Sequence, residues 1–142
     1  NQVGLFRPHL TTGGDADICW RILRETDWKL EFACSAVILH RHRSSLRELR
    51  SQWRRYGTSN RYLHELYGVA LMQELNTQQF LYRLSRWILK ELPRKTIEAI
   101  AGNFDAIEAI STPIDLFILQ ARSLGQRNSK LPDLAKEIEW LE

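Results

Sequence analysis

The chain has 142 residues, of which 44% are hydrophobic and 26% charged, with a net charge of +3; this balance is typical of a globular domain with a core. Cys19 and Cys34 lack CxxC spacing, which excludes a cysteine zinc site or a disulfide scaffold and favours a reducing compartment. No signal peptide or bilayer-spanning apolar run is visible, so we expect a cytoplasmic location, with a peripheral membrane contact left open.

The first expected element is a turn over residues 11–14, which read Thr-Thr-Gly-Gly, followed by a helix from about residue 15 to Thr26. Asp15 or Asp17 would cap this helix, because acids are favoured at the positive end of the helix dipole. A carboxylate on such a turn also suits a general base that takes a proton from an attacking hydroxyl. Spacing alone favours the cap.

Two short strands are expected next. Residues 28–32 alternate between apolar and polar, and residues 36–39 form an apolar run that ends at His40 and His42. Alternation places both histidines on one side of the strand, where they would bind a divalent metal or a phosphate, or donate a proton. A partly exposed strand end explains the same pattern without a ligand.

A basic helix from Leu46 to about Tyr56 follows, and residues 57–60 form a possible break. Gln52, Arg55 and Tyr56 share one helix face, where an amide, a guanidinium and an aromatic ring would contact a sugar and a phosphate. A solvated basic helix is the alternative. The arginine cluster suits nucleic acid, an anionic membrane or a diphosphate, and comprises Arg41, Arg43, Arg47, Arg50, Arg54, Arg55 and Arg61.

The remainder of the chain has helical periodicity. Pro93 would end or kink a helix that begins at Thr77, Thr112 and Pro113 are typical of a helix start, and Gly125 is typical of a helix stop. The segment Thr77 to Lys95 is basic and amphipathic, which suits an anionic membrane surface. Burial of its apolar stripe against another part of the protein is the more frequent explanation.

Three motifs follow one another in a specific order: Gly13 to Arg21, the strand ending at His40, and Gln52 to Gly57. This order resembles family 2 glycosyltransferases, which use nucleotide sugars and invert the anomeric centre. The resemblance implies an α+β, mostly helical chain, in which residues 1–60 form the C-terminal part of a GT-A catalytic domain with short strands near 28–40. Residues 61–142 would form a helical tail.

The resemblance also implies roles for individual side chains. Asp15 would be the catalytic base that deprotonates the acceptor hydroxyl, and His40 or His42 would contact the diphosphate or its metal. The residues expected to shape the turn or to border the acceptor and the diphosphate are Asp17, Arg21, Gln52, Arg55 and Tyr56.

Two positions depart from the family pattern. Gly14 stands where the family usually has Glu, which removes half of an acidic pair, and Tyr56 stands where processive members have Trp. The Asp-x-Asp metal site and the nucleotide-binding half of the family are not found in this sequence. We therefore expect a glycosyltransferase fragment whose Mg²⁺ or Mn²⁺ would be held by the complete domain. Its partners would be a nucleotide-sugar donor and a carbohydrate or lipid-linked acceptor, with no nucleic acid.

A non-catalytic helical module is the rival hypothesis. It would bind nucleic acid or an anionic membrane surface through the arginine cluster. Asp15 and Asp17 argue against nucleic acid, because a nucleic-acid binder gains nothing from these carboxylates. A degenerate remnant that folds without catalysing a reaction is a further alternative.

Overall fold

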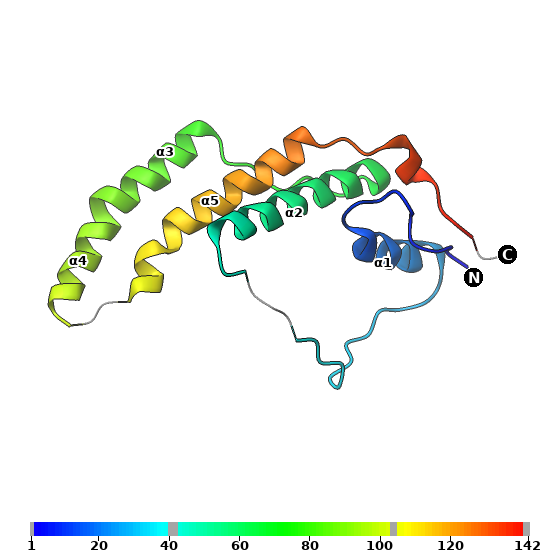
Figure 1. The fold of residues 1–142 in the computed structure, drawn as a ribbon, viewed down its shortest axis with the longest axis horizontal. Coiled ribbons are helices and arrows are strands. Elements are labelled where there is room, and N and C mark those ends of the chain that lie inside the picture. The colour runs from blue at the N-terminus through cyan, green and yellow to red at the C-terminus, as the bar shows by residue number, and fades with distance from the viewer. Residues whose placement is uncertain (1, 40–42, 103–104, 141–142) are drawn as a thin grey trace.

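The computed structural model describes residues 2–39, 43–102 and 105–140. They form an elongated helical molecule (Figure 1). In chain order its elements are α1 (Gly14–Glu25), α2 (Leu46–Tyr67), α3 (Thr77–Arg86), the π-helical turn η1 (Trp87–Glu91), α4 (Leu92–Ile100), α5 (Ala106–Asn128) and the 3-10 turn η2 (Asp133–Lys136). The centre is the pair α2 and α5, with α1 at one end and the hairpin of α3, α4 and α5 at the other.

The helices α2 and α5 run side by side in the same direction and cross at two glycines (Figure 1). A Cβ atom on Gly57 would collide with the carbonyl oxygen of Arg122, and one on Gly125 would collide with the carbonyl oxygen of Arg54. The missing side chains therefore let the two backbones touch. Gly57 and Gly125, expected to break or stop helices, instead lie inside them, and α2 runs through the expected division at residue 60.

The segment from Thr77 to Ile100 forms one continuous rod, in which the π turn η1 joins α3 to α4. It lies antiparallel to the first half of α5 (Figure 1). Pro113, expected at a helix start, is inside α5, where its ring nitrogen has no hydrogen to donate to the Ala109 carbonyl. The indole Nε1–H of Trp87 donates to that carbonyl instead, at 2.9 Å. The neighbouring rod therefore satisfies the carbonyl that proline leaves unpaired.

The N-terminal and C-terminal segments meet beside α1 and the end of α2 (Figure 1). The Leu5 amide donates to the Glu139 carbonyl at 2.8 Å. Tyr62, Leu131 and Ala135 form a small buried apolar cluster. The terminal helix expected over residues 132–142 is limited, in the part of the chain that the structure describes, to η2.

The expected strands at 28–32 and 36–39 are wrong, and so is the α+β class built on a GT-A domain, because the described residues form no strand. The segment 27–39 extends away from the helices (Figure 1). Its apolar side chains face solvent, with Phe32 90% and Leu39 96% exposed.

The physical reason is that a strand is completed only by a neighbour that pairs with its N–H and C=O groups. Within residues 29–39, the Ala36 amide donates a hydrogen bond to the Ala33 carbonyl at 3.0 Å. This bond closes a turn and does not pair two strands. Alternation in the sequence therefore gave these residues a strand-like pattern, but no described segment pairs with them.

Within the described ranges, no helix combines the length and the apolarity that crossing a bilayer requires.

Candidate functional site

The helix α1, which confirms the expected helix over residues 15–26, begins at a glycine turn. Gly13 has a φ of 80°, a left-handed conformation that favours glycine, and a Cβ there would collide with the Ser59 hydroxyl of α2. The turn therefore approaches α2 closely. Asp15 and Asp17 lie in the first turn of α1, after the cap position, and no side chain caps the helix.

A cavity of about 380 Å³ lies between this turn and α2. Asp15 lines it from the α1 side, and Arg55 and Tyr56 line it from the α2 side. The complete lining consists of Thr11, Thr12, Gly13, Asp15, Ala16, Arg55, Tyr56 and Ser59. Three of the residues expected to act together, from segments 40 residues apart, thus share one cavity, which we call the turn cavity.

The polar groups of the turn cavity are accessible. Asp15 is exposed, and so is its opposite neighbour Arg55. The Gln52 amide donates to the Tyr56 hydroxyl at 2.8 Å, and the Tyr56 ring meets the Trp53 ring edge-on with centroids 5.4 Å apart. These two contacts orient the phenol, so Gln52, which does not line the cavity, contributes to it through Tyr56.

Asp17 and Arg21 are fully buried and do not line the turn cavity. The Asp17 carboxylate accepts hydrogen bonds from Arg7 Nε at 2.9 Å and from Arg21 Nε at 3.2 Å, and also from the Tyr67 hydroxyl. Arg21 further donates to the carbonyls of Val3 and Leu5. We call Arg7, Asp17, Arg21 and Tyr67 the polar cluster; it fastens the N-terminal segment and α1 to the end of α2.

Two pKa values in the polar cluster are shifted. Burial of the Tyr67 hydroxyl, together with its hydrogen bond to Asp17, raises the pKa of Tyr67 above its ordinary value of 10. Burial would lower the pKa of Arg7, but its contacts with Tyr67 and Asp17 outweigh burial and raise it. At neutral pH Tyr67 is therefore a neutral phenol and Arg7 a guanidinium cation.

Arg7, Ser59 and Tyr67 had no role in the sequence interpretation, whereas Asp17 and Arg21 were expected to shape the turn or to border the acceptor and the diphosphate. The spacing of Asp17 and Arg21, four residues apart in a helix, is a signal for an ion pair. Ser59 lies one turn beyond Arg55, so the same helical face that gave Arg55 also gives Ser59. Arg7 and Tyr67 carry no comparable signal, because only the fold brings segments 10 and 50 residues distant to Asp17.

The expected metal or diphosphate ligands His40 and His42 lie outside the described residues. Within residues 2–39, 43–102 and 105–140, the structure contains no group of three or more His, Cys, Asp or Glu side chains that would hold a metal ion. The described residues therefore offer no grouped set of ligands for the Mg²⁺ or Mn²⁺ implied by the resemblance.

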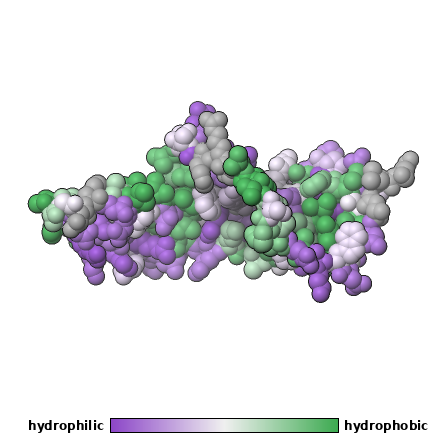
Figure 2. Space-filling model, turned by 90° about the horizontal axis from the view of Figure 1, so that it is seen from below, coloured by the Kyte–Doolittle hydropathy of each residue, from purple (hydrophilic) through white to green (hydrophobic). Residues whose placement is uncertain are grey.

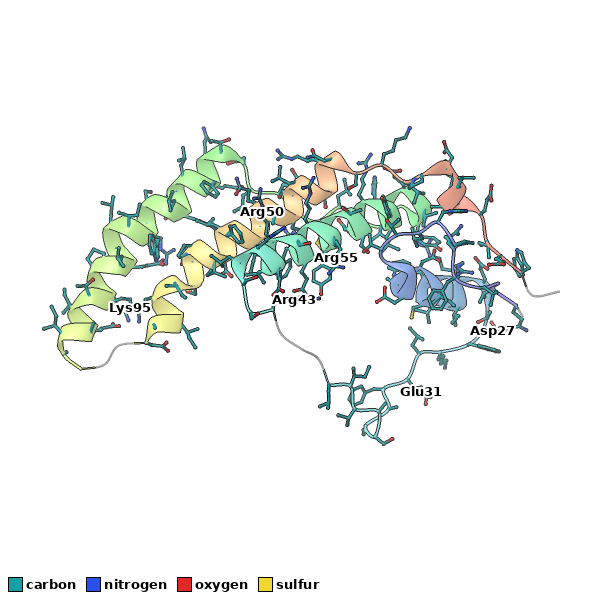
Figure 3. All side chains as sticks on the ribbon, in the orientation of Figure 1. Asp27, Glu31, Arg43, Arg50, Arg55 and Lys95 are labelled. Carbon is teal, nitrogen blue, oxygen red and sulfur yellow. The ribbon has the colours of Figure 1, made fainter. Side chains whose placement is uncertain are left out.

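The arginines between Arg47 and Arg55 are exposed along the helix that forms the cavity wall, whereas Arg61 is partly buried and pairs with Glu65. Figure 3 shows Arg43, Arg50 and Arg55 on or beside α2, and Asp27 and Glu31 on the extended segment. An anionic group entering the turn cavity would therefore meet positive charge on the α2 side and the Asp15 carboxylate on the α1 side.

Comparison of the chain with family models, curated proteins and solved structures finds no match.

Proposed function

We propose that the turn cavity is the acceptor side of a sugar-transfer site, in which Asp15 is the general base. The observation that carries the proposal is the shared cavity: an exposed carboxylate on a glycine turn stands opposite a guanidinium and a phenol. Its volume of about 380 Å³ lies within the range of small-ligand sites. The proposal does not require strands, since one wall is the glycine turn with the start of α1 and the other is α2.

In the proposed reaction, an acceptor hydroxyl attacks the anomeric carbon of a nucleotide sugar. Asp15 takes the hydroxyl proton, a glycosidic bond forms, and the bond between the anomeric carbon and the diphosphate breaks with inversion. The electron pair of that bond leaves with the nucleoside diphosphate. Arg55 would attract negative charge on the donor, and Tyr56 would pack against a sugar ring.

The proposal assigns the donor side, including any metal, to groups beyond the described residues. The chain itself would supply the base and the contacts to the acceptor. This division explains why a carboxylate and a sugar-sized cavity occur without a grouped set of metal ligands among the described residues.

A titration of the ¹⁵N-labelled chain with a panel of mono- and disaccharides, followed by NMR, tests the cavity. We expect amide shifts centred on Gly13, Asp15 and Tyr56, lost in Arg55→Ala. The exposed Arg47, on the same helix outside the cavity, provides the control Arg47→Ala. Saccharides that shift no cavity amide at millimolar concentration would contradict the proposal.

The base is tested in any preparation of the protein that turns over nucleotide sugars. Asp15→Asn should abolish sugar transfer and spare nucleotide binding, whereas the exposed Asp27→Asn should leave transfer unchanged. Full turnover by Asp15→Asn would rule out the assigned base. Salt-dependent binding of arbitrary DNA or RNA, unaffected by Asp15→Asn, would support the non-catalytic module instead.

A further inference from the structure

The hairpin formed by the rod 77–100 and the first half of α5 has two chemically different faces. On one face, two polar hollows of about 230 and 220 Å³ contain Arg86 and Glu91 from the rod and Thr112 and Glu108 from α5. Ion pairs lie on this face. Within the rod, Arg86 Nε pairs with a Glu91 oxygen at 3.1 Å, and Lys95 of the rod pairs with Glu108 of α5. This face is therefore polar and largely satisfied by its own charges.

Apolar side chains cover the other face and the outer edge of the hairpin. Figure 2 shows this separation, with hydrophobic and hydrophilic residues on opposite sides of the half that contains the hairpin. The exposed apolar residues of the hairpin are Leu81, Tyr82, Ile88, Leu89, Leu92, Ile97, Ile100, Ile107 and Ile110; we call them the apolar hairpin face.

Several of these side chains are largely exposed to solvent. Leu89 is 77% exposed, Ile100 84% and Ile107 79%. Large exposed apolar patches on soluble proteins mark interaction surfaces, so the face is a candidate for one. The side of the rod that does pack against α5 carries Trp87 and Glu91 instead.

The net charge of the hairpin indicates which kind of partner surface would bind the apolar hairpin face. Residues 77–100 contain five basic and two acidic residues, a net charge of +3, which equals the net charge of the whole chain. On the outer edge, a shallow hollow of about 390 Å³ is lined by Tyr82, Ser85 and Leu89 together with the cations Arg86 and Lys90. Apolar side chains directly beside basic ones match the acyl chains and phosphate groups of a lipid surface.

We propose that the apolar hairpin face docks onto an anionic lipid bilayer, with Tyr82 and Leu89 entering the interface and Lys90 meeting lipid phosphates. A second copy of the chain fits this face less well, because it would bring the same net positive segment against itself. The hairpin lies at the opposite end of the molecule from α1 (Figure 1), so the inference does not depend on the proposed base.

Co-sedimentation with vesicles tests the proposal, using phosphatidylglycerol-containing vesicles against pure phosphatidylcholine vesicles. The chain should bind the anionic vesicles and lose binding in high salt. Leu89→Glu should weaken binding about tenfold, since one buried leucine is worth roughly that much in partition. Ile38→Glu is the matched control, because Ile38 is 86% exposed on the extended segment and should have no effect.

A charge reversal tests the electrostatic contribution to vesicle binding. Lys90→Glu should weaken binding to anionic vesicles roughly fivefold or more, and the exposed Lys29→Glu should not. Asp15→Asn should bind vesicles as the wild type does. The proposal would be overturned if the chain bound no vesicles or bound neutral and anionic vesicles equally. It would also be overturned if vesicles captured nothing and the chain formed a dimer that Leu89→Glu dissociates.

Discussion

The two joints that hold the walls of the turn cavity depend on different interactions. The joint between α1 and α2 is the polar cluster, in which one buried carboxylate accepts hydrogen bonds from three side chains. The joint between α2 and α5 is a backbone contact that Gly57 and Gly125 make possible. The first joint should therefore respond to charge and the second to volume.

The largest effect should come from removing the charge of the polar cluster. Asp17→Asn leaves Arg7 and Arg21 buried without a carboxylate, and breaking one side of a buried ion pair typically costs about 3–5 kcal/mol. The free energy of unfolding from urea titrations measures this loss. The exposed Asp27→Asn should change it by less than about 0.5 kcal/mol. Similar stability in both variants would mean that the polar cluster does not hold α1.

Added volume at the crossing should have a slightly smaller effect. Gly57→Ala forces a methyl group into the Arg122 carbonyl, and overpacking of this kind typically costs up to about 3 kcal/mol despite the gain in helix propensity. Chemical denaturation provides the measurement. Gly14→Ala is the matched control within a helix, because its nearest contact would be an ordinary 3.5 Å to Phe6. A stable Gly57→Ala would show that the helices do not cross at this residue.

Loss of the Tyr67 hydroxyl should weaken the polar cluster by less than loss of the carboxylate. Tyr67→Phe removes one donor from a buried carboxylate, at a typical cost of about 1–3 kcal/mol. The raised pKa of Tyr67 adds a pH dependence. Its neutral form is favoured in the folded state, so this stabilisation is complete below pH 10 and is lost as the pH rises through the folded pKa.

The pH dependence separates Tyr67 from other alkaline effects. Unfolding followed between pH 8 and 11 should show a steeper loss of stability above pH 10 in the wild type than in Tyr67→Phe. Parallel curves for the two proteins would contradict the coupling between Tyr67 and Asp17.

The smallest effect on stability should come from Asp15, two residues from Asp17. Its side chain is exposed, so Asp15→Asn should shift the free energy of unfolding by less than about 0.5 kcal/mol. Thermal or urea unfolding checks this directly. A loss as large as that of Asp17→Asn would assign Asp15 a structural role and remove it as a candidate base.

The two aspartates show which features of the site can be predicted from neighbouring residues in the sequence. The sequence predicted an acidic turn at the start of a helix, and α1 confirms that helix. Which acid would be buried depended on Arg7 and Tyr67, which approach from other segments. Helix periodicity likewise placed Arg55 and Tyr56 on a shared face, but only the packing of α1 on α2 placed that face opposite Asp15.

The sequence interpretation failed where a local signal had a tertiary explanation. Gly57, Gly125 and Pro113 resemble helix boundaries, yet each lies inside a helix because a neighbour compensates for it. The glycines allow two backbones to touch, and Trp87 pairs the carbonyl that Pro113 leaves free. The apolar alternation at 28–32 gave a strand prediction for the opposite reason, because the described fold supplies no strand to pair with it.

By itself, the sequence determined the helix at the acidic turn and the amphipathic character of residues 77–95, because these depend on neighbours within a few residues. The tertiary structure decided that Asp15 faces a cavity while Asp17 is buried. It also decided that the helices run through their glycines and proline. Burial and backbone pairing are set by contacts between distant segments, and residue spacing along the chain does not encode those contacts.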